Sequence, residues 1–205
     1  MPIPEEVAYY RQCADEYLYG LAPAFGRLRT IVQPQSCYRI HGRNIYSALT
    51  FRAKLDLELS GYDQQCYALR ATLERNGITI DVNAWKPHSW FHRLDRAVGN
   101  ILDTVPEVSK LVLVEGGTWD ANGAFGKRSV RPFFEHNAKD WGPPQDSDAA
   151  IAELESMRST GIDYLAIAWP SFWWFDEYSA FFEQLGNVAT NVLRSDDVLI
   201  YKIHT

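Results

Sequence analysis

The stretch "KLVLVEGG", residues Lys110–Gly117, decides the fold class of this chain. Four apolar residues, Leu111–Val114, stand in an unbroken row, and two glycines end the run. A short, continuous apolar run that stops at glycine is typical of a strand buried on both faces, as strands of parallel sheets are. We therefore predict a buried parallel strand at this point.

The residues after this strand alternate between helix and strand patterns. "DSDAAIAELESMRSTG" (146–161) has helix capping residues at both ends, and "IDYLAIAWP" (162–170) is a second apolar run. "FDEYSAFFEQLG" (175–186) predicts a further helix, and "VATNVLRSDDVLIYKI" (188–203) predicts a hairpin at a sheet edge. We expect an α/β domain that is Rossmann-like, with three layers and a mostly parallel sheet. "GAFGKRSVRPFFE" (123–135) is interpreted as irregular or hairpin-like.

Residues upstream of this domain follow a helical period. "FRAKLDLELSGYDQQCYALRATLERNG" (51–77) carries an apolar residue at every third or fourth position, and a second helix is predicted after it. The chain is thus divided into residues 1–50, a helical connector at 51–105 and the α/β domain at 106–205. The amino-terminal part is expected to be mainly helical.

The composition excludes several classes of partner. A net charge of -6 over 205 residues leaves no basic field for nucleic acid. The apolar runs are too short for a bilayer span, so no membrane insertion is expected. The three cysteines are widely spaced without a CxxC pair, and the first residues do not resemble a signal peptide. These features predict a cytoplasmic location.

The first candidate site combines an acidic helix with a histidine. Asp15 and Glu16 lie in a predicted helix, and His41 ends a predicted strand in "YRIHG" (38–42). A carboxylate can deprotonate a hydroxyl group, and a neutral imidazole can bind a divalent metal ion or a phosphate. On spacing alone, a solvated acid and a turn histidine are the simpler interpretation.

The segment "ADEYLYGLAPAFGRLRTIVQPQSCYRIHGRNIYS" (14–47) resembles the end of the catalytic domain of bacterial family 2 glycosyltransferases, which are inverting enzymes of GT-A fold. The likeness covers about residues 4–47. It implies that Asp15 is the catalytic base that takes a proton from the acceptor hydroxyl. It also implies that His41 lies beside the sugar diphosphate and its metal ion, and that Arg39 supports this donor site.

The same resemblance implies a function for the chain. It would transfer a sugar from a nucleotide-sugar donor to a glycan acceptor in polysaccharide biosynthesis, with Mg²⁺ or Mn²⁺ bound in the complete enzyme. The family's donor-binding half and its Asp-x-Asp motif have no counterpart here, and no cofactor is evident for this chain alone. Residues 1–50 are therefore expected to be a remnant of the catalytic tail that needs a donor-binding half or self-association. Residues 106–205 resemble an uncharacterised α/β segment found downstream of such transferases.

The second candidate site is aromatic. "VEGGTWD" (114–120), "DWGPPQD" (140–146) and "AWPSFWWFDEY" (168–178) each follow a predicted strand or precede a helix. In open α/β sheets, ligands bind at the carboxyl ends of the strands. Aromatic rings pack on the C–H faces of sugars, and carboxylates accept hydrogen bonds from their hydroxyl groups. The side chains that could line one cleft here are Trp119, Trp141, Trp169, Trp173, Trp174, Glu115, Asp120, Asp176 and Glu177. Of these, the candidate glycan-binding residues are Trp119, Trp141, Trp169, Trp174 and Asp176.

The alternative is that these tryptophans fill the layer between helix and sheet. Trp173 and Trp174 are adjacent and cannot share one helical face, so we expect one in the core and one pointing outward. No G-x-G-x-x-G motif follows the first strand, which disfavours a dinucleotide enzyme. The sequence leaves two functions open: a glycosyltransferase portion, or a non-catalytic α/β module that binds glycan or protein.

Overall fold

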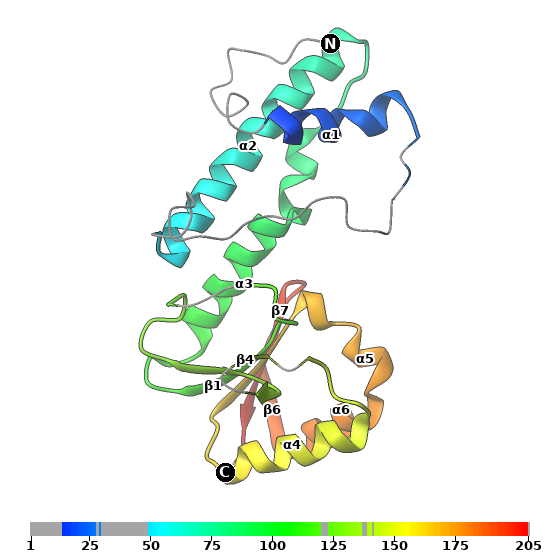
Figure 1. Ribbon diagram of the computed structural model, residues 1–205. Coiled ribbons are helices and arrows are strands. Elements are labelled where there is room, and N and C mark those ends of the chain that lie inside the picture. Colours follow the sequence, from blue (N-terminus) through cyan, green and yellow to red (C-terminus); the bar gives the residue numbers. More distant parts are fainter. Residues whose placement is uncertain are drawn as a thin grey trace. The chain divides into compact units, whose positions relative to one another are not determined.

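The computed structural model describes residues 14–27, 29, 49–119, 123–136, 139–140 and 142–204 (Figure 1). The chain divides into two compact units, Met1–His92 and Arg93–Thr205. Helix α3 (Trp90–Thr104) begins in the first unit, and most of its length belongs to the second. None of the helices in the described residues is both long and apolar enough to cross a membrane.

The described residues of the first unit include the helices α1 (Ala14–Phe25) and α2 (Phe51–Arg75) and the short 3-10 turns η2 (Val82–Ala84) and η3 (Lys86–His88). Helix α2 begins where the Thr50 hydroxyl accepts a hydrogen bond from the amide of Ala53, which is the usual role of an N-cap side chain. A small apolar cluster joins α1 to the last turns of α2 and contains Leu21, Ala68, Leu69 and Leu73.

A five-stranded mixed sheet forms the centre of the second unit, in the order β2-β1-β5-β7-β6. Strand β1 pairs in parallel with both β2 and β5, whereas β7 runs antiparallel to β5 and to β6. The α/β class, the two buried parallel strands and the edge hairpin are thus confirmed. The strands span β1 (Lys110–Val114), β2 (Ser129–Pro132), β5 (Tyr164–Ala168), β6 (Ala189–Arg194) and β7 (Val198–Ile203). A separate antiparallel pair consists of β3 (Glu135–His136) and β4 (Lys139–Asp140).

One face of the sheet packs on the helices that follow the strands, and Figure 1 shows α4 and α6 together beside the sheet. A single core cluster joins Val112 and Ile167 of the strands to Leu154 of α4 and Phe181 of α6. These helices are α4 (Ser147–Ser159), the 3-10 turn η4 (Trp169–Ser171), α5 (Trp174–Glu177) and α6 (Ser179–Val188).

Helix α3 is attached at both ends to other segments of the second unit. Arg93 and Arg96 bind Asp197 in the β6–β7 turn, and Arg128, just before β2, donates to the carbonyl of Leu102. The buried side chains of α3 recur at helical spacing, at Leu94, Ala97, Val98 and Ile101. Strand β5 is buried at all five positions, so both of its faces are covered.

Candidate functional site

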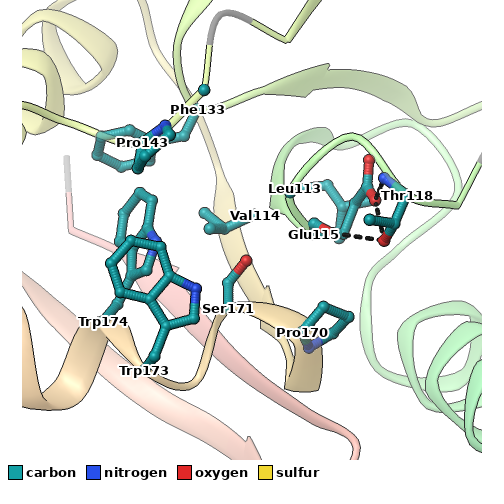
Figure 2. Close-up of a pocket in the computed structure, with 12 residues that line it drawn as sticks. Leu113, Val114, Glu115, Thr118, Phe133, Pro143, Pro170, Ser171, Trp173 and Trp174 are labelled. Atoms are coloured by element: carbon teal, nitrogen blue, oxygen red, sulfur yellow. Dashed lines mark hydrogen bonds between the residues drawn. The ribbon is translucent and has the colours of Figure 1, made fainter. Parts of the chain in front are cut away.

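A cavity of about 260 Å³ lies at the carboxyl ends of β1 and β5 (Figure 2). Its walls come from four segments of the second unit: the end of β1 with the following loop, Phe133 after β2, the Gly142–Pro143 segment, and the Pro170–Trp174 segment after β5. This is the edge of the sheet at which ligands bind in open α/β folds. The cavity is therefore the candidate binding site of this unit.

The loop after β1 is held by its own carboxylate. The Glu115 Oε2 atom accepts hydrogen bonds from the amides of Thr118 and Trp119, the second at 2.8 Å, and the Thr118 hydroxyl donates to the Glu115 carbonyl at 2.8 Å. Gly116 and Gly117 adopt φ values of 70° and 68°, in the left-handed region that favours glycine. A Cβ atom on Gly116 would lie 3.8 Å from the Ser171 hydroxyl, so two loops approach each other here.

The segment after β5 places one indole in the core and one beside the solvent. The Trp174 side chain is 3% exposed and packs edge to face against Phe133 and Tyr178, whereas Trp173 is 44% exposed. Figure 2 shows Trp173 and Trp174 at one end of the cavity and Glu115 and Thr118 at the other. The prediction that the two neighbours face different ways is confirmed. The exposed ring belongs to Trp173, which was expected to line the cleft but was not chosen as a glycan-binding candidate.

One buried hydrogen bond fixes the backbone around Trp174. The Tyr178 hydroxyl donates a buried hydrogen bond of 2.7 Å to the carbonyl of Pro144, which ties the Gly142–Pro143 wall to the start of α6. Burial also raises the pKa of Tyr178, so that it stays protonated as a donor. Ser171 is buried in the 3-10 turn η4 and lines the cavity between its two ends.

A second aromatic group lies at the same edge of the sheet and does not line the cavity. Trp119 is buried, and its ring centroid lies 5.3 Å from that of Trp169. The Arg93 guanidinium lies 5.0 Å above the Trp169 ring. Arg93 and Arg96 both bind the carboxylate of Asp197, at 2.8 and 2.7 Å. Trp119 and Trp169 therefore serve packing and a cation–π contact in this structure.

The remaining predicted residues add no side chain to the described lining of this cavity. Asp176 is exposed near the end of α5 and is not among the described lining residues. Trp141 lies outside the described residues, as do Arg39 and His41. Asp15 belongs to α1, and its side chain lies outside the described part. The proposed base, donor and metal positions of a transferase thus stay predictions.

Sequence reasoning expected Trp173 in the lining but missed Gly116 and Ser171. The available signal was their position, directly after the two apolar strand runs, where strand ends meet. Within the described residues, no group of three or more His, Cys, Asp or Glu side chains could hold a metal ion. Comparison with protein-family models, curated proteins and solved structures found no match for the chain.

Proposed function

We propose that the second unit binds a carbohydrate in the cavity at the ends of β1 and β5. The observation that carries this proposal is an exposed indole, Trp173, at one end of a cavity that also presents the buried Ser171 and the backbone of Gly116. A sugar ring has an apolar C–H face and a rim of hydroxyl groups. An aromatic face and a few convergent polar groups match both features.

The cavity size supports a small ligand. Pockets for drug-sized ligands measure roughly 300–1,000 Å³, and this cavity measures about 260 Å³. One sugar ring is a better match than an extended chain. The lining also supports binding without catalysis, because glycoside chemistry uses a pair of carboxylates and Glu115 is the one carboxylate among the described lining residues. Its oxygen is already engaged by the Thr118 and Trp119 amides.

The proposal includes a Rossmann-like, three-layer arrangement of this unit. Burial of β5 at every position and the buried stripe of α3 support helices on both faces. The antiparallel strand β7 between β5 and β6 is a departure from an all-parallel sheet.

A matched pair of tryptophan variants tests carbohydrate binding. Trp173→Ala removes the exposed ring of the cavity, whereas Trp85→Ala removes a 38% exposed ring from the first unit. Neutral methyl glycosides are titrated against each full-length variant by NMR. We expect Trp173→Ala to weaken binding by roughly tenfold or more, because stacking area is lost, and Trp85→Ala to bind like the wild type. Absence of binding by the wild type, or equal loss in both variants, would contradict the proposal.

A second candidate is the C-terminal portion of a glycosyltransferase, with Asp15 as base, Arg39 and His41 at the donor, and Mg²⁺ or Mn²⁺ in the complete enzyme. The likeness of residues 14–47 to family 2 transferases supports it, as does the helix α1 that carries Asp15. It would act in the cytoplasm on a glycan acceptor. Its test is sugar transfer with a donor-binding half supplied: Asp15→Asn is expected to abolish transfer, and unchanged transfer would exclude Asp15 as base.

A further inference from the structure

The described lining of the cavity carries negative charge and no positive charge. Among the described residues that line it, Glu115 is the one with an ionisable side chain, and none is lysine, arginine or histidine. Two arginines of the same unit, Arg93 and Arg96, bind Asp197 instead. The described wall of the cavity thus contains a carboxylate and no compensating cation.

The Glu115 carboxylate also accepts hydrogen bonds from the backbone N–H groups that an anionic ligand would need. A turn that follows a strand and contains two left-handed glycines presents backbone N–H groups, and such groups bind phosphates and carboxylates in many proteins. Here the amides of Thr118 and Trp119 donate to the Glu115 side chain, and Figure 2 draws the bonds between Glu115 and Thr118. These two N–H groups therefore already bind an anion that belongs to the loop itself, the Glu115 carboxylate.

From these two observations we infer that the cavity selects uncharged sugars, and that Glu115 is the residue that excludes acidic ones. The inference rests on the proposed carbohydrate function and names its ligand class. Uronic acids, sugar phosphates and nucleotide sugars would bring a second negative charge toward Glu115. Like charges a few ångströms apart near a protein surface repel strongly enough to weaken binding by roughly tenfold or more.

The test compares sugars that differ only in a carboxylate. Methyl glucoside and methyl glucuronide form one pair, and methyl galactoside and methyl galacturonide form another. Each is titrated at neutral pH against the full-length chain by NMR, and the ratio of the acidic to the neutral dissociation constant is the measured quantity. For the wild type we expect this ratio to be roughly ten or more in the pair that binds.

Three variants or conditions locate the cause of that ratio. Glu115→Gln keeps an acceptor oxygen for the loop amides and removes the charge, so the ratio should fall toward one. Glu155→Gln removes a carboxylate from α4 that binds Arg158 and Gln184, and it should keep the wild-type ratio. High salt should lower the ratio of the acidic to the neutral dissociation constant in the wild type itself. This measurement tests the charge effect even where Glu115→Gln disturbs the loop.

The outcomes separate this inference from the function on which it rests. Equal affinity for the acidic and neutral members, or a ratio that survives both Glu115→Gln and high salt, would overturn the exclusion by Glu115 and leave carbohydrate binding intact. If neither member of any pair binds the wild type, the carbohydrate function fails and this inference fails with it.

Discussion

At the scale of single residues, Gly116 shows how a backbone conformation builds the cavity wall. Its φ of 70° costs a residue with a Cβ about 1–2 kcal/mol, whereas the 3.8 Å from an added Cβ to the Ser171 oxygen is an ordinary contact. We expect Gly116→Ala to lower the free energy of unfolding by about that amount. The matched control is Gly99→Ala inside α3, where nothing lies within 4 Å; it should be neutral or stabilising by up to about 1 kcal/mol. Urea denaturation measures both, and equal effects would contradict the prediction.

Asp197 illustrates a buried charge whose partners make it tolerable. The side chain accepts hydrogen bonds from both Arg93 and Arg96, and the residue is 4% exposed. Asp197→Ala leaves two guanidinium groups without this partner, and we expect a loss of about 2–4 kcal/mol in the free energy of unfolding. The neighbouring Asp196 has an exposed side chain, so Asp196→Ala should change stability by less than about 0.5 kcal/mol. Similar losses in the two variants, measured by thermal or urea unfolding, would show that the ion pairs contribute little.

At the scale of elements, a side chain from another segment caps the C-terminal end of α3. The last turn of a helix leaves carbonyl groups without partners, and Arg128 donates to the carbonyls of Leu102 and Val105, with Nη2–O and Nε–O distances of 2.7 Å. α3 has no basic residue of its own in its last turn. Arg128 therefore serves as the C-terminal cation of this helix from outside it.

Removing this contact should loosen the end of α3. We expect Arg128→Ala to cost about 1–3 kcal/mol and to speed amide hydrogen exchange in the last turn, because several charge-assisted hydrogen bonds are lost. The adjacent Lys127 is 80% exposed and lies 4.0 Å from Glu107, so Lys127→Ala should leave exchange unchanged. Unaltered protection in Arg128→Ala would indicate that packing alone holds the helix end.

At the scale of the whole molecule, buried tyrosine and cysteine side chains lower the stability of both units at alkaline pH. Burial raises the pKa of Tyr62 to about 12 in the first unit, and it raises the pKa of Tyr178 and Tyr201 in the second. The pKa of the Cys66 thiol is raised by burial as well. In each case the folded state holds the proton to a higher pH than the unfolded chain does.

The sign of the pH effect follows from these shifts. Well below pH 10, the ordinary pKa of tyrosine, the tyrosines are protonated in both states and their contribution to stability is complete. Between pH 10 and about 12 the unfolded chain releases the Tyr62 proton while the folded chain keeps it, so stability falls as the pH rises. Because Tyr62 is partly exposed, we expect Tyr62→Phe to reduce this alkaline loss by on the order of 1 kcal/mol. Urea midpoints at pH 8 and near pH 11 test it, and an equal loss in both proteins would contradict it.

Part of the fold was predictable because it is encoded locally. The strands β1 and β5 follow from apolar runs ended by glycine or proline, and α4 follows from its capping residues: the Asp146 side chain accepts from the amide of Ala149 at 2.8 Å. Strand β2, in contrast, was not predicted as part of the main sheet. It contains Pro132 and shows no alternation of burial, and it is a strand because Ser129–Pro132 pair in register with β1.

The candidate site was predictable only in its location. The sequence pointed to the carboxyl ends of the strands, where the cavity lies, and it placed Trp119, Trp173 and Trp174 at that site. Trp174 lines the cavity but is 3% exposed, and Trp173 has the accessible ring. Trp119 is buried and packs at a tilt against Trp169. Two adjacent tryptophans have the same local pattern, so their roles depend on residues that are distant in the chain.

The amino acid order by itself determined the class of the second unit: an α/β sheet with parallel strands at its centre and an antiparallel hairpin at its edge. Periodicity and capping act within a few residues and are visible in a short window of sequence. Only the tertiary structure decided which indole is exposed at the cavity, because Phe133, more than forty residues away, packs on Trp174 and leaves Trp173 to the solvent. It also decided that Glu115 turns back on its own loop, since that contact depends on the left-handed backbone of the two glycines that follow it.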